Sequence, residues 1–181
     1  MDKPSQRREL KATIANISDK ARQSGIIANI LQNAPLPSGS ICIYNSLPSE
    51  VDTKEIIKYF CQSRDVYLPV VEGNNMLLVK VDKDTEYKEA NWGIYEPIGE
   101  RFLPSEVCPS VTLTPLLGVD KNLNRLGKGK GYYDRYFNAV DTFKVGLAFE
   151  EQVIDEVVCD SWDKPLDMVI TPQGVIKRQD L

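Results

Sequence analysis

Short apolar runs that lack polar alternation constrain the fold of this chain more than any other feature. They occupy residues 40–44 (SICIY), 66–68, 76–81 (MLLVKV), 111–113, 144–149 (KVGLAF) and 168–170. Runs of this kind are typical of strands that are covered on both faces. Their alternation with helical stretches favours an α/β fold, with an open, largely parallel (mixed) sheet flanked by helices. Ligands of such sheets bind beyond the carboxyl ends of strands, which directs attention to the loops after Tyr44 and Leu117.

Cap and turn residues set the expected boundaries of these elements. Residues 1–33 predict two helices, with a break at which Ser18 is the N-cap of the second. Thr53 is expected to cap a third helix, and Pro69 is expected to end the strand that begins at Val66. A hairpin is expected to join the run at 168–170 to Val175 and Ile176.

The absence of histidine from the sequence excludes several kinds of catalytic site. A Ser-His-Asp triad, a Cys-His protease site and an HExxH zinc site all require it. The cysteines form no CxxC pair, so we expect reduced, buried thiols rather than a zinc site. The cysteines are Cys42, Cys61, Cys108 and Cys159.

Charge, hydropathy and length bound the remaining possibilities. A net charge of -4 argues against general binding to nucleic acid or to a membrane surface. No apolar run approaches the roughly 18 residues that span a bilayer, and the N-terminus lacks the apolar region of a signal peptide. At roughly 100–200 residues per domain, residues 1–181 are expected to form a single, cytoplasmic domain.

One segment, residues 124–135 (NRLGKGKGYYDR), differs from the rest of the chain. Four basic residues and one acidic residue give it a net charge of +3. Glycines let backbone amides point into a concavity, and the helix expected to follow adds its partly positive N-terminus. Both features suit a phosphate group. Asp134, about one turn into that helix, is placed to hold a Mg²⁺ ion shared with the phosphates.

The residues alone leave more than one function open. A Walker A loop needs Ser or Thr where Gly131 stands, and a dinucleotide-binding GxGxxG motif needs glycine where Tyr132 stands. A solvated basic loop therefore remains an alternative. So do a sugar-phosphate isomerase or acyl-CoA transferase on a similar sheet, and a non-catalytic nucleotide-binding or RNA-binding module. A requirement for ATP would exclude the isomerase and the transferase, because those enzymes need no nucleotide hydrolysis.

Several blocks together resemble the 5-formyltetrahydrofolate cyclo-ligase family, also called methenyltetrahydrofolate synthetases. The central block, residues 125–134 (RLGKGKGYYD), resembles the family signature. The other blocks come in the family's order and span nearly the whole chain. They are Lys3-x3-Arg7, residues 44–53 (YNSLPSEVDT), 92–97 (WGIYEP), 145–149 (VGLAF), and Asp163-x3-Asp167 followed by 169–171 (VIT). The chain departs from the family pattern at Gln6, Asn45, residues 115–118 (PLLG) and Trp162.

The resemblance implies a fold similar to the sugar-phosphate isomerase and CoA-transferase folds. It also implies a reaction. The reaction is the closure of 5-formyltetrahydrofolate to 5,10-methenyltetrahydrofolate, with ATP as co-substrate, Mg²⁺ as cofactor, and ADP and phosphate as products. The formyl oxygen would attack the γ-phosphate, and N10 would capture the phosphorylated intermediate. The implied partners are these small molecules, without nucleic acid or membrane, and the chain is expected to be a monomer.

The resemblance also implies roles for individual residues. The ATP-binding residues would be Lys3, Arg7, Arg125, Gly127, Lys128, Gly129, Lys130, Gly131, Tyr132 and Tyr133. Arg125, Lys128 and Lys130 would stabilise the charge that moves during phosphoryl transfer. The folate-binding residues would be Asn45, Glu50, Trp92, Tyr95 and Tyr132, and the magnesium ligands would be Asp134 and Asp163. We expect Glu50 to bind the pterin separately from the nucleotide, because the two sites use different loops.

Overall fold

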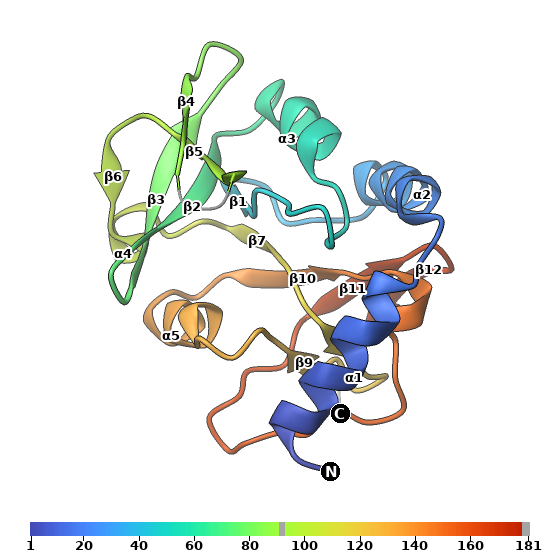
Figure 1. Cartoon of the computed structure of the whole chain (residues 1–181). Coiled ribbons are helices and arrows are strands. Elements are labelled where there is room, and N and C mark those ends of the chain that lie inside the picture. The colour runs from blue at the N-terminus through green and yellow to red at the C-terminus, as the bar shows by residue number, and fades with distance from the viewer. Residues whose placement is uncertain (91–92, 179–181) are drawn as a thin grey trace.

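The computed structural model describes residues 1–90 and 93–178 and contains an eight-stranded sheet with helices on both faces (Figure 1). The helices are α1 (Lys3–Ala15), α2 (Lys20–Gln32), α3 (Lys54–Cys61), α4 (Pro104–Val107) and α5 (Tyr132–Ala139), with a 3-10 turn at Glu150–Gln152. The strands are β1 (Ile41–Ile43), β2 (Val66–Glu72), β3 (Asn75–Val81), β4 (Tyr87–Glu89), β5 (Tyr95–Pro97), β6 (Arg101–Phe102), β7 (Val111–Thr114), β8 (Gly118–Val119), β9 (Arg125–Leu126), β10 (Phe143–Leu147), β11 (Met168–Thr171) and β12 (Gly174–Lys177).

The large sheet is parallel in the middle and antiparallel at its edges. Its strand order is β12-β11-β10-β7-β1-β2-β3-β6. The five strands from β11 to β2 run parallel, whereas β12 and β3 pair antiparallel with their neighbours β11 and β2. The predicted α/β fold with an open, largely parallel (mixed) sheet is therefore confirmed, as is the hairpin formed by β11 and β12.

The direction of winding reverses between β1 and β7. From β1 the chain passes through α3 to β2 on one side, and from β7 it passes through α5 to β10 on the other. The carboxyl ends of β1 and β7 therefore flank a topological switch point, where open α/β sheets bind ligands. The two loops singled out from the sequence lie there, although the second begins at Pro115 because β7 ends at Thr114.

The two faces of the sheet explain why its strands lack polar alternation. Ile41 and Ile43 of β1 belong to a core cluster that includes residues of α2 and α3, whereas Cys42 packs with Tyr136 and Phe137 of α5. Figure 1 shows α5 on the opposite side of the sheet from α2 and α3. All three residues of β1 are buried, and a strand covered on both faces needs apolar side chains at every position.

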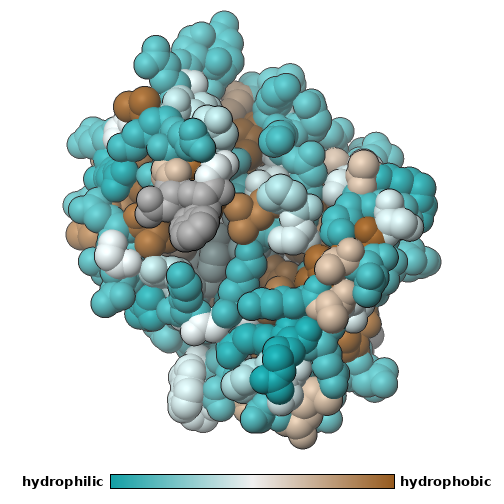
Figure 2. Space-filling model, viewed as in Figure 1, coloured by the Kyte–Doolittle hydropathy of each residue, from teal (hydrophilic) through white to brown (hydrophobic). Residues whose placement is uncertain are grey.

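The surface around α1, β9 and α5 is mostly hydrophilic. Figure 2 shows this in the lower half of the molecule, where the hydrophobic areas are small and scattered. Among the described residues, no helix is both long and apolar enough to cross a membrane. A hydrophilic surface at this end of the molecule suits ligands that carry charge.

Two local predictions are wrong for identifiable physical reasons. The N-cap of α2 is Asp19 rather than Ser18, and the Asp19 carboxylate accepts hydrogen bonds from Arg22 and Gln23 instead of from a backbone amide. Pro69 does not end β2, which continues to Glu72. Because β1 pairs with β2 only as far as Tyr67, the missing N–H of Pro69 lies beyond the part of β2 that has neighbours on both sides.

The cysteines are free thiols, as expected, but they are not all buried. Cys42 is fully buried, and burial raises the pKa of its thiol to about 12. Cys108 and Cys159 are exposed, contrary to the prediction. Cys108 is the C-cap residue of the short helix α4, in the left-handed conformation, and its thiol donates to the carbonyl of Ser105 at 3.1 Å. The number and spacing of cysteines alone cannot tell a buried thiol from an exposed one.

Candidate functional site

The loop after β1 is held in a fixed course by its own side chains. The Thr53 hydroxyl donates to the carbonyl of Tyr44 at 2.7 Å and accepts from the amide of Ser46 at 3.1 Å. Thr53 is the N-cap residue of α3, as predicted, but its hydroxyl closes this loop rather than capping the helix. The Glu50 carboxylate accepts from the amide of Leu47 at 2.7 Å. These bonds orient Glu50 toward the loop that follows β9.

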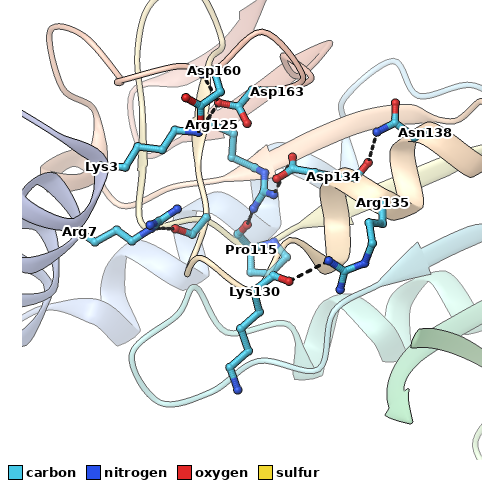
Figure 3. Close-up of polar contacts among 11 residues, drawn as sticks. Lys3, Arg7, Pro115, Arg125, Lys130, Asp134, Arg135, Asn138, Asp160 and Asp163 are labelled. Atoms are coloured by element: carbon cyan, nitrogen blue, oxygen red, sulfur yellow. Dashed lines mark hydrogen bonds and ion pairs between the residues drawn. The ribbon is translucent and has the colours of Figure 1, made fainter. Parts of the chain in front are cut away.

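Arg125 is a buried cation beneath the glycine-lysine loop. Its guanidinium donates to the carbonyl of Pro115 at 3.0 Å and lies 3.7 Å from the carboxylate of Asp134. It also lies 5.5 Å from the centre of the Tyr133 ring. Only 7% of its side chain is exposed, and this burial lowers its pKa, against the opposing influence of Asp134. Arg125 therefore anchors the start of the loop to the end of β7 (Figure 3).

The glycines of this loop leave room for arginine side chains. A Cβ atom at Gly127 would lie 2.9 Å from Nη1 of Arg125, and one at Gly129 would lie 3.2 Å from Cζ of Arg7. Gly129 also has a φ of 102°, a conformation that other residues adopt only with strain. The Arg7 side chain of α1 donates to the carbonyl of Gly127 at 2.9 Å. The loop is thus packed between two arginines.

The lysines of the loop have different surroundings. Nζ of Lys128 lies 3.2 Å from the Glu50 carboxylate, whose side chain is only 9% exposed. The two loops that we expected to serve separate ligands are therefore in direct contact. Lys130 is exposed, and its Nζ has no ion pair or hydrogen bond within the described part of the chain. Its side chain extends away from the other charged groups (Figure 3).

Lys3 joins α1 to the segment before β11. Its ammonium donates to the carboxylates of Asp160 and Asp163 at 2.5 Å each. Burial alone would lower the pKa of Lys3, but the two carboxylates outweigh it and raise this pKa. Asp160 was not expected from the sequence, because nothing in the residue pattern distinguishes it from other loop acids. Figure 3 shows Lys3 pointing at both carboxylates.

The two expected magnesium ligands both lie near Arg125. Asp134 forms the ion pair described above, and the charge of Asp163, like that of Asp134, opposes the lowering of the Arg125 pKa by burial. Each carboxylate faces a cation, Arg125 for Asp134 and Lys3 for Asp163. No cluster of three or more His, Cys, Asp or Glu side chains suited to a metal occurs within residues 1–90 and 93–178.

The expected aromatic residues fall into three groups. Tyr95 is 55% exposed, and its carbonyl accepts from the side-chain amide of Asn45 at 2.9 Å, which brings two expected folate contacts together. Tyr132 donates from its hydroxyl to the carbonyl of Gly73 at 3.1 Å. Tyr133 packs into the apolar cluster under α5, and burial raises its pKa well above the usual value. Trp92 lies outside the described residues.

Two supporting residues were missed from the sequence. The buried Asp120 carboxylate accepts from the amides of Asn122, Asn124 and Val157, and so fixes the turn that leads into β9. The acid followed by asparagines is typical of such turns and could have revealed it. Gln6, one of the departures from the family pattern, accepts from the amide of Val158 at 3.0 Å.

Two shallow polar depressions lie at the opposite edge of the sheet. Both are lined by residues at the amino ends of strands, one by Ser110, Asp141 and Lys144 and the other by Ser40 and Arg64. An ion pair between Lys144 and Asp167 lies at that edge too, but its side chains are more exposed than the nearly buried Arg125 and Glu50 at the carboxyl ends of β1 and β7. We therefore assign the candidate site to the carboxyl edge.

The chain is similar to known proteins over most of its length. A family model described as "5-formyltetrahydrofolate cyclo-ligase family" matches residues 1–172. The 5-formyltetrahydrofolate cyclo-ligase of Mus musculus is 32% identical over 184 residues, covering 91% of this chain and 90% of the relative. That of Haemophilus influenzae is 33% identical over 138 residues, covering 70% and 72%.

A solved structure shows the same fold over the full length. The 5,10-methenyltetrahydrofolate synthetase of Aquifex aeolicus superposes with a TM-score of 0.86 at 31% identity, covering 100% of this chain and 95% of that one. The matched family model, the relatives and the fold lead to one conclusion. This chain belongs to the 5-formyltetrahydrofolate cyclo-ligase family.

Proposed function

We propose that this chain catalyses the ATP-dependent cyclisation of 5-formyltetrahydrofolate to 5,10-methenyltetrahydrofolate at the carboxyl edge of β1 and β7. The observation that carries the proposal is the 3.2 Å contact between Lys128 and Glu50. It joins a loop suited to phosphates to a loop with a carboxylate suited to pterin N–H groups. The reaction needs this proximity, because the γ-phosphate must reach the formyl oxygen.

The reaction balances as two displacements. The formyl oxygen forms a bond to the γ-phosphorus while the bond from that phosphorus to ADP breaks. N10 then attacks the formyl carbon, the phosphorylated oxygen leaves as phosphate, and N10 loses its proton. An amide-like oxygen is a poor leaving group, and its phosphorylation makes the second displacement feasible. This chemistry needs positioning and charge stabilisation rather than a histidine base.

The charged residues of the site divide this work. Lys130, exposed and unpaired in the described chain, is available to the γ-phosphate, and Lys128 can leave Glu50 to join it. The backbone of Gly127 and Gly129 lies against Arg125 and Arg7, and the amides of this glycine-rich stretch can approach phosphate oxygens closely. Glu50, released from Lys128, can accept hydrogen bonds from the pterin ring.

The carboxylates of Asp134 and Asp163 fit a magnesium ion in kind and number. Mg²⁺ prefers oxygen ligands and is commonly bound through one or two carboxylates together with substrate phosphates. When bound, it would neutralise charge on the phosphates of ATP. Both carboxylates already lie beside the cations of the proposed phosphate site, Arg125 and Lys3.

Asp134→Asn is expected to raise the Mg²⁺ concentration needed for the half-maximal rate by about 10-fold or more. The substitution removes one negative charge at nearly constant shape. A titration of the initial rate with Mg²⁺ at saturating ATP measures the effect. Asp141→Asn, at the opposite edge of the sheet, is the matched control. An unchanged magnesium dependence would show that Asp134 is only the structural partner of Arg125.

The proposal assigns this activity to residues 1–181 as one domain and treats the enzyme as a cytoplasmic monomer. Formation of the methenyl product, followed by its absorbance, tests it. We expect product only when 5-formyltetrahydrofolate, ATP and Mg²⁺ are all present. Product that forms without ATP would refute the proposal and favour a nucleotide-independent enzyme. ATP binding without any product would favour a non-catalytic nucleotide-binding module.

A further inference from the structure

The first turn of α5 is tied to the turn between β2 and β3. Nη2 of Arg135 donates to the carbonyl of Asn74 at 3.1 Å, and the Tyr132 hydroxyl donates to the carbonyl of Gly73 at 3.1 Å. Gly73 and Asn74 are the two residues that connect these strands. Two side chains of α5 therefore occupy both carbonyls of a turn that lies about sixty residues earlier in the chain.

The same guanidinium also holds the glycine-lysine loop. Nη1 of Arg135 donates to the carbonyl of Lys130 at 3.0 Å (Figure 3), and Cζ lies 5.2 Å from the centre of the Tyr132 ring. Gly131 has a φ of 73°, and a Cβ atom there would lie 2.8 Å from Nη1. The planar fork of arginine can donate to two separate carbonyls at once, which a lysine ammonium does less well.

We propose that Arg135 is a positioning residue that braces the phosphate loop against the β2–β3 turn, with Tyr132 as the second part of the brace. The support is a hairpin in which β2 and β3 pair over seven residues, from Val66↔Val81 to Glu72↔Asn75. A glycine-rich loop is otherwise free to adopt many conformations. Holding it in one conformation lowers the cost of ordering it around phosphates. The inference rests on the proposed function, since the loop that is braced is the proposed ATP site.

Arg135→Met should raise the KM for ATP by about 10- to 100-fold and leave the KM for 5-formyltetrahydrofolate within about twofold. Arg135→Lys should behave like Arg135→Met, because it keeps the charge but loses the fork. Arg22→Met is the matched control, since Arg22 pairs with Asp19 on the exposed face of α2. A wild-type KM for ATP in Arg135→Lys would overturn the brace and show that only the charge matters.

The other side of the brace can be tested without changing Arg135. Two glycines inserted between Gly73 and Asn74 would displace the accepting carbonyls. This insertion should also raise the KM for ATP. Combined with Arg135→Met, it should add little further effect, because both changes break the same connection. Multiplicative effects of the two changes would overturn the proposal.

Binding of a non-hydrolysable ATP analogue, measured by calorimetry without folate, separates this inference from the proposed function. If the wild type binds the analogue but forms no methenyl product, the proposed function fails. In that case, weaker binding of the analogue by Arg135→Met than by the wild type would still support the brace. If Arg135→Met raises the KM for ATP and for folate equally, or lowers Tm strongly, the brace is overturned, because the substitution has then damaged the fold in general. A wild type that binds no nucleotide would overturn both.

Discussion

Lys130→Met is expected to lower kcat by about 10²- to 10³-fold while leaving the fold intact. Removal of one group that stabilises transition-state charge commonly costs this much. Lys130 is exposed, and its side chain forms no ion pair or hydrogen bond in the described part of the chain, so its loss should hardly change the free energy of unfolding. Steady-state kinetics at saturating folate, together with a thermal melt, measure both quantities.

The matched control for this prediction is Lys121→Met. Lys121 is also exposed and precedes β9, but it lies before the glycine-lysine loop. The control should retain wild-type kcat and KM for ATP. Wild-type kinetics for Lys130→Met at subsaturating ATP would mean that the loop does not bind the transferred phosphate through this residue.

Glu50→Gln is expected to lower kcat/KM for 5-formyltetrahydrofolate by roughly 10- to 150-fold. A hydrogen bond to a charged group contributes about 1.5–3 kcal/mol, and about 1.4 kcal/mol corresponds to a factor of ten. The glutamine keeps an oxygen for the amide of Leu47 but loses the charge that would accept from the pterin. Initial rates at limiting folate and saturating ATP measure the loss.

The contact between Glu50 and Lys128 gives this variant a second signature. Without the Glu50 carboxylate, this ion pair no longer competes with phosphate for Lys128. The affinity for ATP, measured without folate, should therefore rise about 1.5- to 5-fold. Glu55→Gln is the control, because Glu55 is an exposed acid on α3 that pairs with the exposed Lys58. Weaker binding of both ligands would indicate a damaged fold, and an unchanged folate response would show that Glu50 does not bind the pterin.

The sequence predicts those parts of the fold that depend on local patterns. The unbroken apolar strands follow from burial on both faces, and the glycine-lysine loop before α5 follows from its own composition. The predicted boundary at Pro69 was wrong because tertiary context decides it, and the predicted N-cap at Ser18 was wrong by one residue. The N-cap of α2 is Asp19. The pairing of β1 with β2 ends at Tyr67, so β1 does not need the N–H group that Pro69 lacks.

The parts of the site that could not be predicted are contacts between distant segments. Lys3 meets Asp160 and Asp163 across more than 150 residues, and Arg135 meets the β2–β3 turn across 61. No residue pattern encodes such pairs, because they depend on how the sheet places its loops. The contact between Lys128 and Glu50 is of the same kind, and it brings together two loops that were expected to bind separate ligands.

Transfer of an oxygen isotope tests the central claim most directly. If the substrate carries ¹⁸O in its formyl group, the proposed displacement moves that oxygen to the γ-phosphorus. We predict one ¹⁸O atom in each phosphate released per methenyl product, measured by mass spectrometry of the inorganic phosphate. Methenyl product accompanied by unlabelled phosphate would contradict the claim, because the formyl oxygen would then have left without being phosphorylated.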